Sequence, residues 1–123
     1  MEYQLENSHP AYIKINVKGY LTKTGMLTAI LEVMKHPDYH HKHSFWDCTD
    51  AMMGMSIFDL MEIVEIFKSY KPQGENFANK IAVLISGNMN MAIMEIFTPM
   101  TISLPFHFKA FTTQDDLEKF LSS

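Results

Sequence analysis

The sequence predicts an α/β fold with a mostly parallel sheet of four or five strands, an antiparallel edge hairpin and about four helices. The main observation is that strand-like and helix-like segments alternate along the whole 123-residue chain. Parallel strands need helical crossovers of this kind. The second observation is the 47% hydrophobic content, which is typical of a globular core. A chain of this length is expected to form a single domain over residues 1–123.

The chain begins with a predicted hairpin and a helix. Ala11–Lys18 alternates apolar and polar residues, as a half-buried strand does, and Tyr3–Glu6 precedes it as an antiparallel partner. Apolar residues then recur at helical spacing from Lys23 to Met34. The helix is expected to end at His36-Pro37, because the residue before a proline is disfavoured in a helix.

The middle of the chain predicts a buried strand, a methionine-rich loop and a second helix. Ser44–Cys48 is a compact apolar strand with an acidic exit. The second helix is expected to begin at Ser56, because Ser56 and Asp59 closely resemble a capping box. Its core stripe is expected to contain Ile57, Leu60, Met61, Val64 and Phe67.

The last part of the chain predicts two further strands and two further helices. After a polar turn, Lys80–Ser86 is an almost unbroken apolar run, which is typical of a strand covered on both faces. A methionine-rich helix is predicted from Asn88 to Phe97. A strand over Phe106–Phe111 follows, and Thr113 caps a final helix.

The charge distribution excludes some functions. All ten basic residues are lysines, the net charge is −4 and no basic cluster is present, so nucleic-acid binding is not expected. No apolar run reaches the roughly 18 residues of a membrane-spanning helix. The acidic, polar amino terminus does not resemble a signal peptide, so a cytoplasmic location is expected. The lone Cys48 is then expected to be a reduced thiol.

Several short motifs resemble those of the SpoIIAA-like superfamily, which includes the STAS domains of anti-sigma-factor antagonists. The similarity covers nearly the whole chain and is greatest to the uncharacterised bacterial branch of that superfamily. The motifs are Gly19-Tyr20-Leu21-Thr22, Phe45-Trp46-Asp47, Asp50-Ala51, Lys80-Ile81-Ala82-Val83, Pro105-Phe106 and Phe120-Leu121. The resemblance implies a SpoIIAA-like sandwich.

Ser56 is the residue for which this resemblance implies a role. In regulatory STAS members, a segment Asp-Ser-Ser-Gly-Leu opens the helix after the third strand, and a partner kinase phosphorylates one of its serines. Here Met55-Ser56-Ile57-Phe58 keeps one serine but lacks the preceding Asp and the following Gly. Ser56 is therefore either a simple helix N-cap or also a phosphorylation site, since a phosphate is favoured at a helix amino terminus.

Methionines follow two of the predicted strands and suggest a binding edge. They are Met52, Met53 and Met55 after one strand, and Met89, Met91 and Met94 after the other. Because the carboxyl ends of parallel strands meet at one edge, both groups are expected there, where open α/β sheets bind ligands. Flexible thioethers suit an adaptable apolar pocket or partner surface. The alternative is that they only fill the core.

Other polar residues are weaker candidates. Asp47 and Asp50 are expected to act as general bases, as Mg²⁺ ligands or, more commonly, as caps of the following loop. Four histidines, His36, His40, His41 and His43, suggest either zinc ligands or a solvated loop. No cofactor or metal is predicted. No nucleophile–base pair can be found in the sequence, so an enzyme using Asp47, Asp50 or Cys48 ranks last.

The function that follows is a non-enzymatic binding or regulatory module. It would present the methionine-rich edge and the helix that begins at Ser56 to a protein partner. The alternative is a carrier or sensor of a small apolar or lipid-like ligand in a pocket at the same edge. An exposed edge of this kind would also favour a homodimer.

Overall fold

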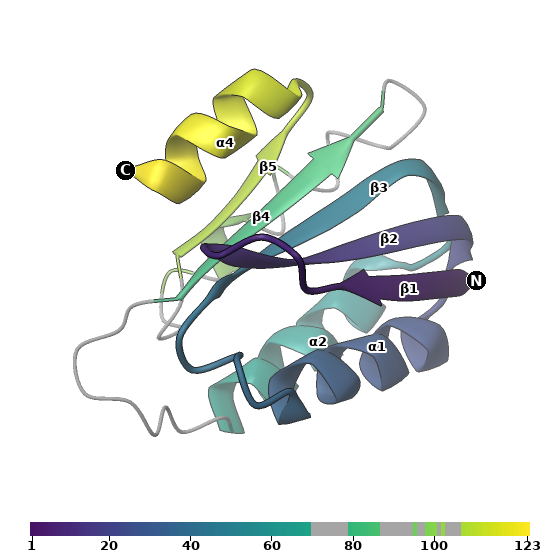
Figure 1. Cartoon of the computed structure of the whole chain (residues 1–123). Coiled ribbons are helices and arrows are strands. Elements are labelled where there is room, and N and C mark those ends of the chain that lie inside the picture. Colours follow the sequence, from purple (N-terminus) through teal and green to yellow (C-terminus); the bar gives the residue numbers. More distant parts are fainter. Residues whose placement is uncertain (70–78, 87–94, 96–97, 101, 103–106) are drawn as a thin grey trace.

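The computed structural model of this chain describes residues 1–69, 79–86, 95, 98–100, 102 and 107–123. The strands and helices in this part of the chain follow one another in the order shown in Figure 1. They are β1 (Glu2–Glu6), β2 (Tyr12–Leu21), α1 (Lys23–Lys35), β3 (His43–Met53), α2 (Ile57–Ser69), β4 (Lys80–Ile85), β5 (His107–Phe111) and α4 (Gln114–Ser122).

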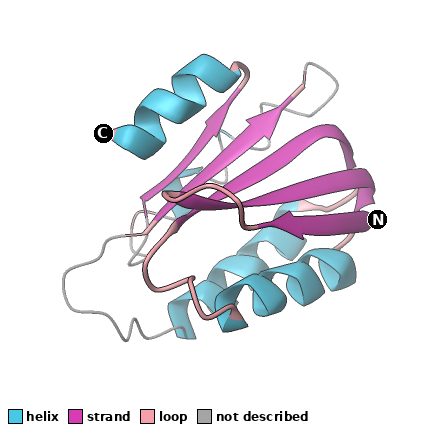
Figure 2. Ribbon diagram, viewed as in Figure 1, coloured by secondary structure: helices cyan, strands magenta, loops and turns pink. Residues whose placement is uncertain are grey.

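The strands form one mixed sheet in the order β1-β2-β3-β4-β5. β1 and β2 are antiparallel, and every other pair is parallel. Helices α1 and α2 lie on one face of the sheet and α4 lies on the other (Figures 1 and 2). The predicted parallel sheet with an antiparallel edge hairpin is therefore confirmed.

The sheet separates two hydrophobic cores. The larger core lies between the sheet and helices α1 and α2, and it contains Ile15 of β2 and Val83 of β4. The smaller core lies beneath α4, where Leu84 of β4 packs with Phe111 and Leu117. Neighbouring residues of β4 thus point into different cores. This arrangement confirms the prediction that this strand is buried on both faces.

Strand β3 is longer than predicted and contains a bulge. Asn16 of β2 is paired with Asp47, but Lys18 is paired with Asp50, so β3 has one extra residue between the two pairs. The bulge changes the alternation along the strand, and both Cys48 and Ala51 are buried in the larger core.

The predicted end of this strand is wrong. Thr49 and Asp50 interrupt the apolar pattern and therefore look like a strand terminus, although pairing with β2 continues to Met53. The residues that we expected to lie after the strand belong to the strand itself. They are Asp50, Met52 and Met53.

Side-chain caps fix the beginnings of the helices. The Thr113 hydroxyl accepts a hydrogen bond from the Asp116 amide, which confirms the predicted cap of α4. Thr22 caps α1 in the same way, with its Oγ1 3.1 Å from the Gly25 nitrogen, and this cap was not predicted. The helix predicted over 88–97 lies, apart from Glu95, outside the described residues. No helix within the described ranges is long and apolar enough to cross a membrane.

Candidate functional site

The candidate site is at the carboxyl ends of β2 and β3, which lie side by side. Tyr20 is paired with Met52, and Leu21 is paired with Met53. Gly54 follows, and a Cβ atom at this position would lie only 2.6 Å from the Leu21 carbonyl oxygen. A glycine therefore lets β3 turn closely past the end of β2 on its way to α2.

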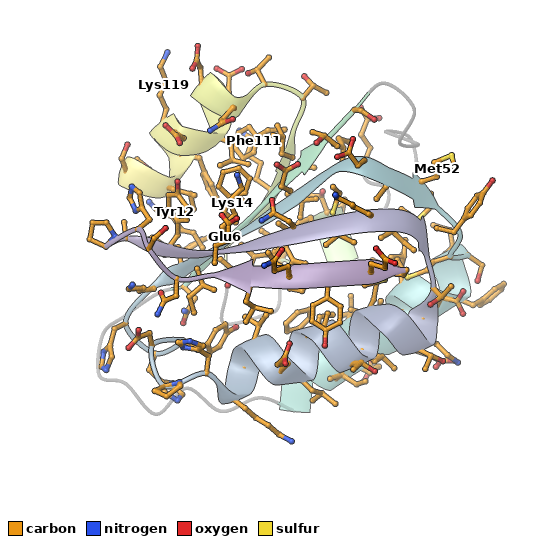
Figure 3. All side chains as sticks on the ribbon, turned by 45° about the vertical axis from the view of Figure 1, so that its right-hand side comes forward. Glu6, Tyr12, Lys14, Met52, Phe111 and Lys119 are labelled. Carbon is orange, nitrogen blue, oxygen red and sulfur yellow. The ribbon has the colours of Figure 1, made fainter. Side chains whose placement is uncertain are left out.

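The methionines at this turn divide between the surface and the core. Met52 is 41% exposed, and Figure 3 shows it at the far end of β3. Met53 is half-buried, and Met55 is only 6% exposed and packs in the larger core. Of this group, only Met52 offers a side chain to a partner without rearrangement.

A reciprocal capping box begins α2. The Ser56 amide donates a hydrogen bond to Asp59 Oδ2 (3.0 Å), and the Asp59 amide donates one to Ser56 Oγ (3.2 Å). The predicted N-cap is therefore confirmed. Ser56 is also exposed, but a phosphoryl group on its Oγ would lie next to the Asp59 carboxylate, and like charges repel.

Most of the large exposed apolar side chains in the described residues come from elements that meet at this end of the molecule. Six large apolar side chains are exposed in the described residues, namely Tyr20, Leu31, Met52, Phe58, Met61 and Ile102. Four of these come from the ends of β2 and β3 and the first turns of α2. These four residues, Tyr20, Met52, Phe58 and Met61, are called the edge patch below. Continuous apolar surface marks interaction sites, whereas scattered exposed apolar residues are normal.

An ion pair next to Met61 in the sequence joins the two helices. Lys23 Nζ of α1 lies 3.0 Å from Glu62 Oε2 of α2, the residue that follows Met61. Both side chains are well exposed, so this ion pair adds little stability. It supplies a polar rim beside the apolar side chains.

A small apolar cavity lies on the inner side of this edge, between the sheet and helices α1 and α2. Its volume is about 70 Å³, and all its described lining residues are apolar or sulfur-containing. Met26, Met53 and Met55 contribute to its wall, together with Cys48. The cavity is well below the roughly 300 Å³ of a pocket for a drug-sized ligand. In this form it has room only for a very small apolar group.

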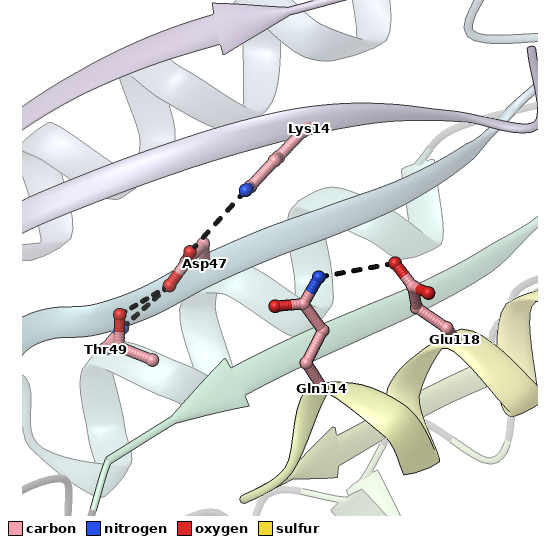
Figure 4. Close-up of polar contacts among 5 residues, drawn as sticks. All are labelled: Lys14, Asp47, Thr49, Gln114 and Glu118. Atoms are coloured by element: carbon pink, nitrogen blue, oxygen red, sulfur yellow. Dashed lines mark hydrogen bonds and ion pairs between the residues drawn. The ribbon is translucent and has the colours of Figure 1, made fainter. Parts of the chain in front are cut away.

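Cys48 and Asp47 have structural roles. Burial, with a smaller contribution from Asp47, raises the pKa of the Cys48 thiol to about 12, so the thiolate needed for nucleophilic attack is scarce at neutral pH. Asp47 accepts hydrogen bonds from the Thr49 amide (3.1 Å) and hydroxyl (2.7 Å), and Lys14 Nζ lies 3.8 Å away (Figure 4). Asp47 thus stabilises the bulge, while Asp50 is exposed opposite Lys18.

The histidines are spread over the loop before β3 and the start of that strand. His36 Nδ1 accepts the Asp38 amide hydrogen (3.1 Å), and His43 Nδ1 accepts that of Lys80 (3.0 Å). In the part of the chain that the structure describes, no group of three or more His, Cys, Asp or Glu side chains is placed to hold a metal ion.

Comparison with known proteins identifies the fold. No protein-family model matches the chain, and no curated protein does. A crystal structure of an uncharacterised protein from the DUF3478 family with a SpoIIAA-like fold, from Shewanella loihica PV-4, matches 98% of this chain and 92% of that chain, with a TM-score of 0.54. This chain has a SpoIIAA-like fold. At 17% identity, the match is evidence for the SpoIIAA-like fold alone.

Sequence reasoning located the edge of this SpoIIAA-like domain but missed part of its exposed surface. Met61 was expected in the core stripe of α2, yet it is 48% exposed. Phe58, three residues before it, is 76% exposed on the same helix. One signal in the sequence could have revealed this exposed surface. Two apolar residues of α2 are spaced i and i+3 but do not fit the core stripe of the helix. Met89, Met91 and Met94, the second half of the predicted methionine edge, lie outside the described residues.

Proposed function

We propose that this protein is a non-enzymatic binding or regulatory module of the STAS type. It presents the edge patch, with the helix that begins at Ser56, to a protein partner. The observation that carries the proposal is that four of the six large apolar side chains exposed in the described residues belong to the ends of β2 and β3 and the start of α2. This is also the carboxyl edge of the sheet, where open α/β domains bind their ligands.

The chemistry of the edge patch suits protein docking. Tyr20 and Phe58 are aromatic anchors of the type enriched in binding hot spots. Met52 and Met61 adapt their shape to a partner because the thioether side chain is flexible. The patch rests on paired strand ends and a capped helix, so little ordering is needed on binding.

Ser56 offers a way to regulate this docking. Its exposed hydroxyl precedes Phe58 by two residues on the same helix start. A phosphoryl group there would introduce up to two negative charges beside apolar contacts and next to Asp59. In this proposal, phosphorylation of Ser56 releases the partner.

Site-specific photo-crosslinking tests the proposal. The photoreactive residue p-benzoylphenylalanine would replace Phe58 in one variant and Lys119, exposed on α4 across the sheet, in a matched control. In cells of the source organism, the Phe58 variant should form one discrete protein adduct, and Met52→Lys should diminish it. An adduct of twice the mass would identify a second copy as the partner. No adduct at Phe58, or equal adducts at both positions, would contradict the proposal.

A second candidate function is a carrier or sensor of a small apolar ligand. The observation in its favour is the apolar cavity behind Met53 and Met55. A ligand larger than a few carbon atoms would require these side chains and Met26 to turn outward. Native mass spectrometry distinguishes the two functions, because a ligand adds a small mass and a partner adds the mass of a protein.

A further inference from the structure

The outer long edge of the sheet, formed by β1, contains a second surface that the proposed function does not use. β1 is the outer strand of the sheet and pairs only with β2 among the described strands. It lies above α1 at the margin of the fold (Figure 1). Between β1 and α1 runs an open groove of about 390 Å³, lined by Tyr3, Leu5, Glu32 and His36.

The two faces of β1 differ in chemistry. Glu2, Gln4 and Glu6 are exposed, whereas Tyr3 and Leu5 are half-buried and pack against the larger core. Burial, followed by the nearby Glu32 carboxylate of α1, raises the pKa of the Tyr3 hydroxyl, so these two side chains approach each other across the groove. A strand added beside β1 would therefore meet acids on one face and a partly apolar groove on the other.

Charges on the exposed face alternate from strand to strand. Glu2 of β1 is opposite Lys18 of β2, and Lys18 is opposite Asp50 of β3. Glu6 is likewise opposite Lys14, and both are labelled in Figure 3. Opposite charges facing each other across strands are favourable, and like charges are not. A basic strand added next to the acidic β1 would continue this alternation of charge from strand to strand.

We propose that the free edge of β1 binds an extended basic segment of a partner protein by strand addition. Lysine or arginine residues at positions i and i+4 of that segment lie beside Glu2 and Glu6, which have the same spacing. Apolar residues at i+1 and i+3 point into the groove toward Tyr3 and Leu5. Main-chain hydrogen bonds to β1 supply affinity, and these alternating side chains supply specificity.

A second copy of the chain is a poor occupant of this edge. Antiparallel pairing of two β1 strands centred on Gln4 would place Glu2 of each copy opposite Glu6 of the other. Two like-charge contacts disfavour this pairing, in the way that charged edge strands prevent self-association. The same acids favour a basic partner.

Binding of a defined peptide tests the inference. The probe is a fluorescent nine-residue peptide with Lys-Val-Thr-Val-Lys at its centre, and the matched control has glutamate in place of both lysines. The lysine peptide should bind saturably and shift the amide resonances of β1. The glutamate peptide should bind at least about fivefold more weakly, since two attractive contacts become repulsive.

Backbone methylation of the peptide separates strand addition from simple charge attraction. In an added strand, alternate amides face β1 and the others face solvent. N-methylation of one alternate set should therefore abolish binding, whereas methylation of the other set should leave it nearly unchanged. Equal binding of the two methylated peptides, or no saturable binding of the lysine peptide, would overturn the inference.

Variants of the protein complete the test. Glu2→Gln together with Glu6→Gln should weaken binding of the lysine peptide about three- to tenfold. Glu65→Gln, an exposed acid on α2, should leave it unchanged. If both variants bind alike, the acids of β1 are not the contact. The outcome is independent of the edge patch, so failure here leaves the proposed function standing, and the reverse also holds.

Discussion

Met52 lies directly opposite Tyr20 at the carboxyl ends of β3 and β2, and both side chains are exposed to solvent, by 41% and 61%. Cross-strand pairs with an aromatic residue typically stabilise a sheet by about 0.2–1 kcal/mol relative to alanine pairs. This pair instead leaves much of its apolar surface in water, next to the turn that leads into α2. This exposed surface is available for contact with another molecule.

Loss of the Ser56 hydroxyl should weaken the start of α2. Ser56→Ala removes an acceptor for the Asp59 amide and should lower the free energy of unfolding by about 1 kcal/mol. Ser56→Asp should retain most of the stability because aspartate is also a good N-cap. Urea unfolding measures both, with Ser8→Ala as the control. If Ser56→Ala leaves the free energy of unfolding unchanged, the cap is not formed in solution.

Removal of the most exposed side chain should not destabilise the fold. Phe58→Ser should change the free energy of unfolding by no more than about 0.5 kcal/mol, because Phe58 is 76% exposed. Leu60→Ala, two residues later and buried, should cost about 2–5 kcal/mol. Thermal unfolding of the two variants compares them. A large loss for Phe58→Ser would show that this ring belongs to the core.

The Cys48 thiol should be unreactive in the native protein. Because burial raises its pKa to about 12, almost no thiolate is present at pH 8. Modification by a disulfide reagent should therefore proceed only as fast as the protein opens, and should become immediate in denaturant. Rapid modification of the folded protein at pH 8 would contradict the buried placement of this residue.

Acid should destabilise the protein partly through His43. Burial, followed by the charge of Lys80, lowers the pKa of His43 below its usual 6.5, and its Nδ1 accepts the Lys80 amide hydrogen. The unfolded chain therefore binds a proton more readily, so the His43 contribution to stability is complete above pH 6.5 and declines as pH falls toward the folded-state pKa. His43→Gln should reduce this pH dependence, measured by urea unfolding between pH 5 and about pH 8. The exposed His41→Gln should leave it intact, and an unchanged slope in both variants would refute the assignment.

Local patterns predicted most of the fold because the responsible interactions are local. The apolar run in β4 and the Thr113 cap each depend on a few neighbouring residues, and both are confirmed. The end of β3 was missed because pairing with β2 keeps the strand going past Thr49 and Asp50, and periodicity does not report partners distant in sequence. Tyr20 and Phe58 escaped notice for a similar reason, since exposure depends on how strand ends and helices meet.

Native mass spectrometry of the protein purified from its own host tests the central claim most directly. We predict a stoichiometric complex with a protein partner, and its loss in the Phe58→Ser variant, whose fold stays intact. A mass increase of about 80 Da from phosphorylation of Ser56 should occur only on the partner-free protein. Unmodified monomer without a partner, or a complex that persists in Phe58→Ser, would contradict docking through the edge patch.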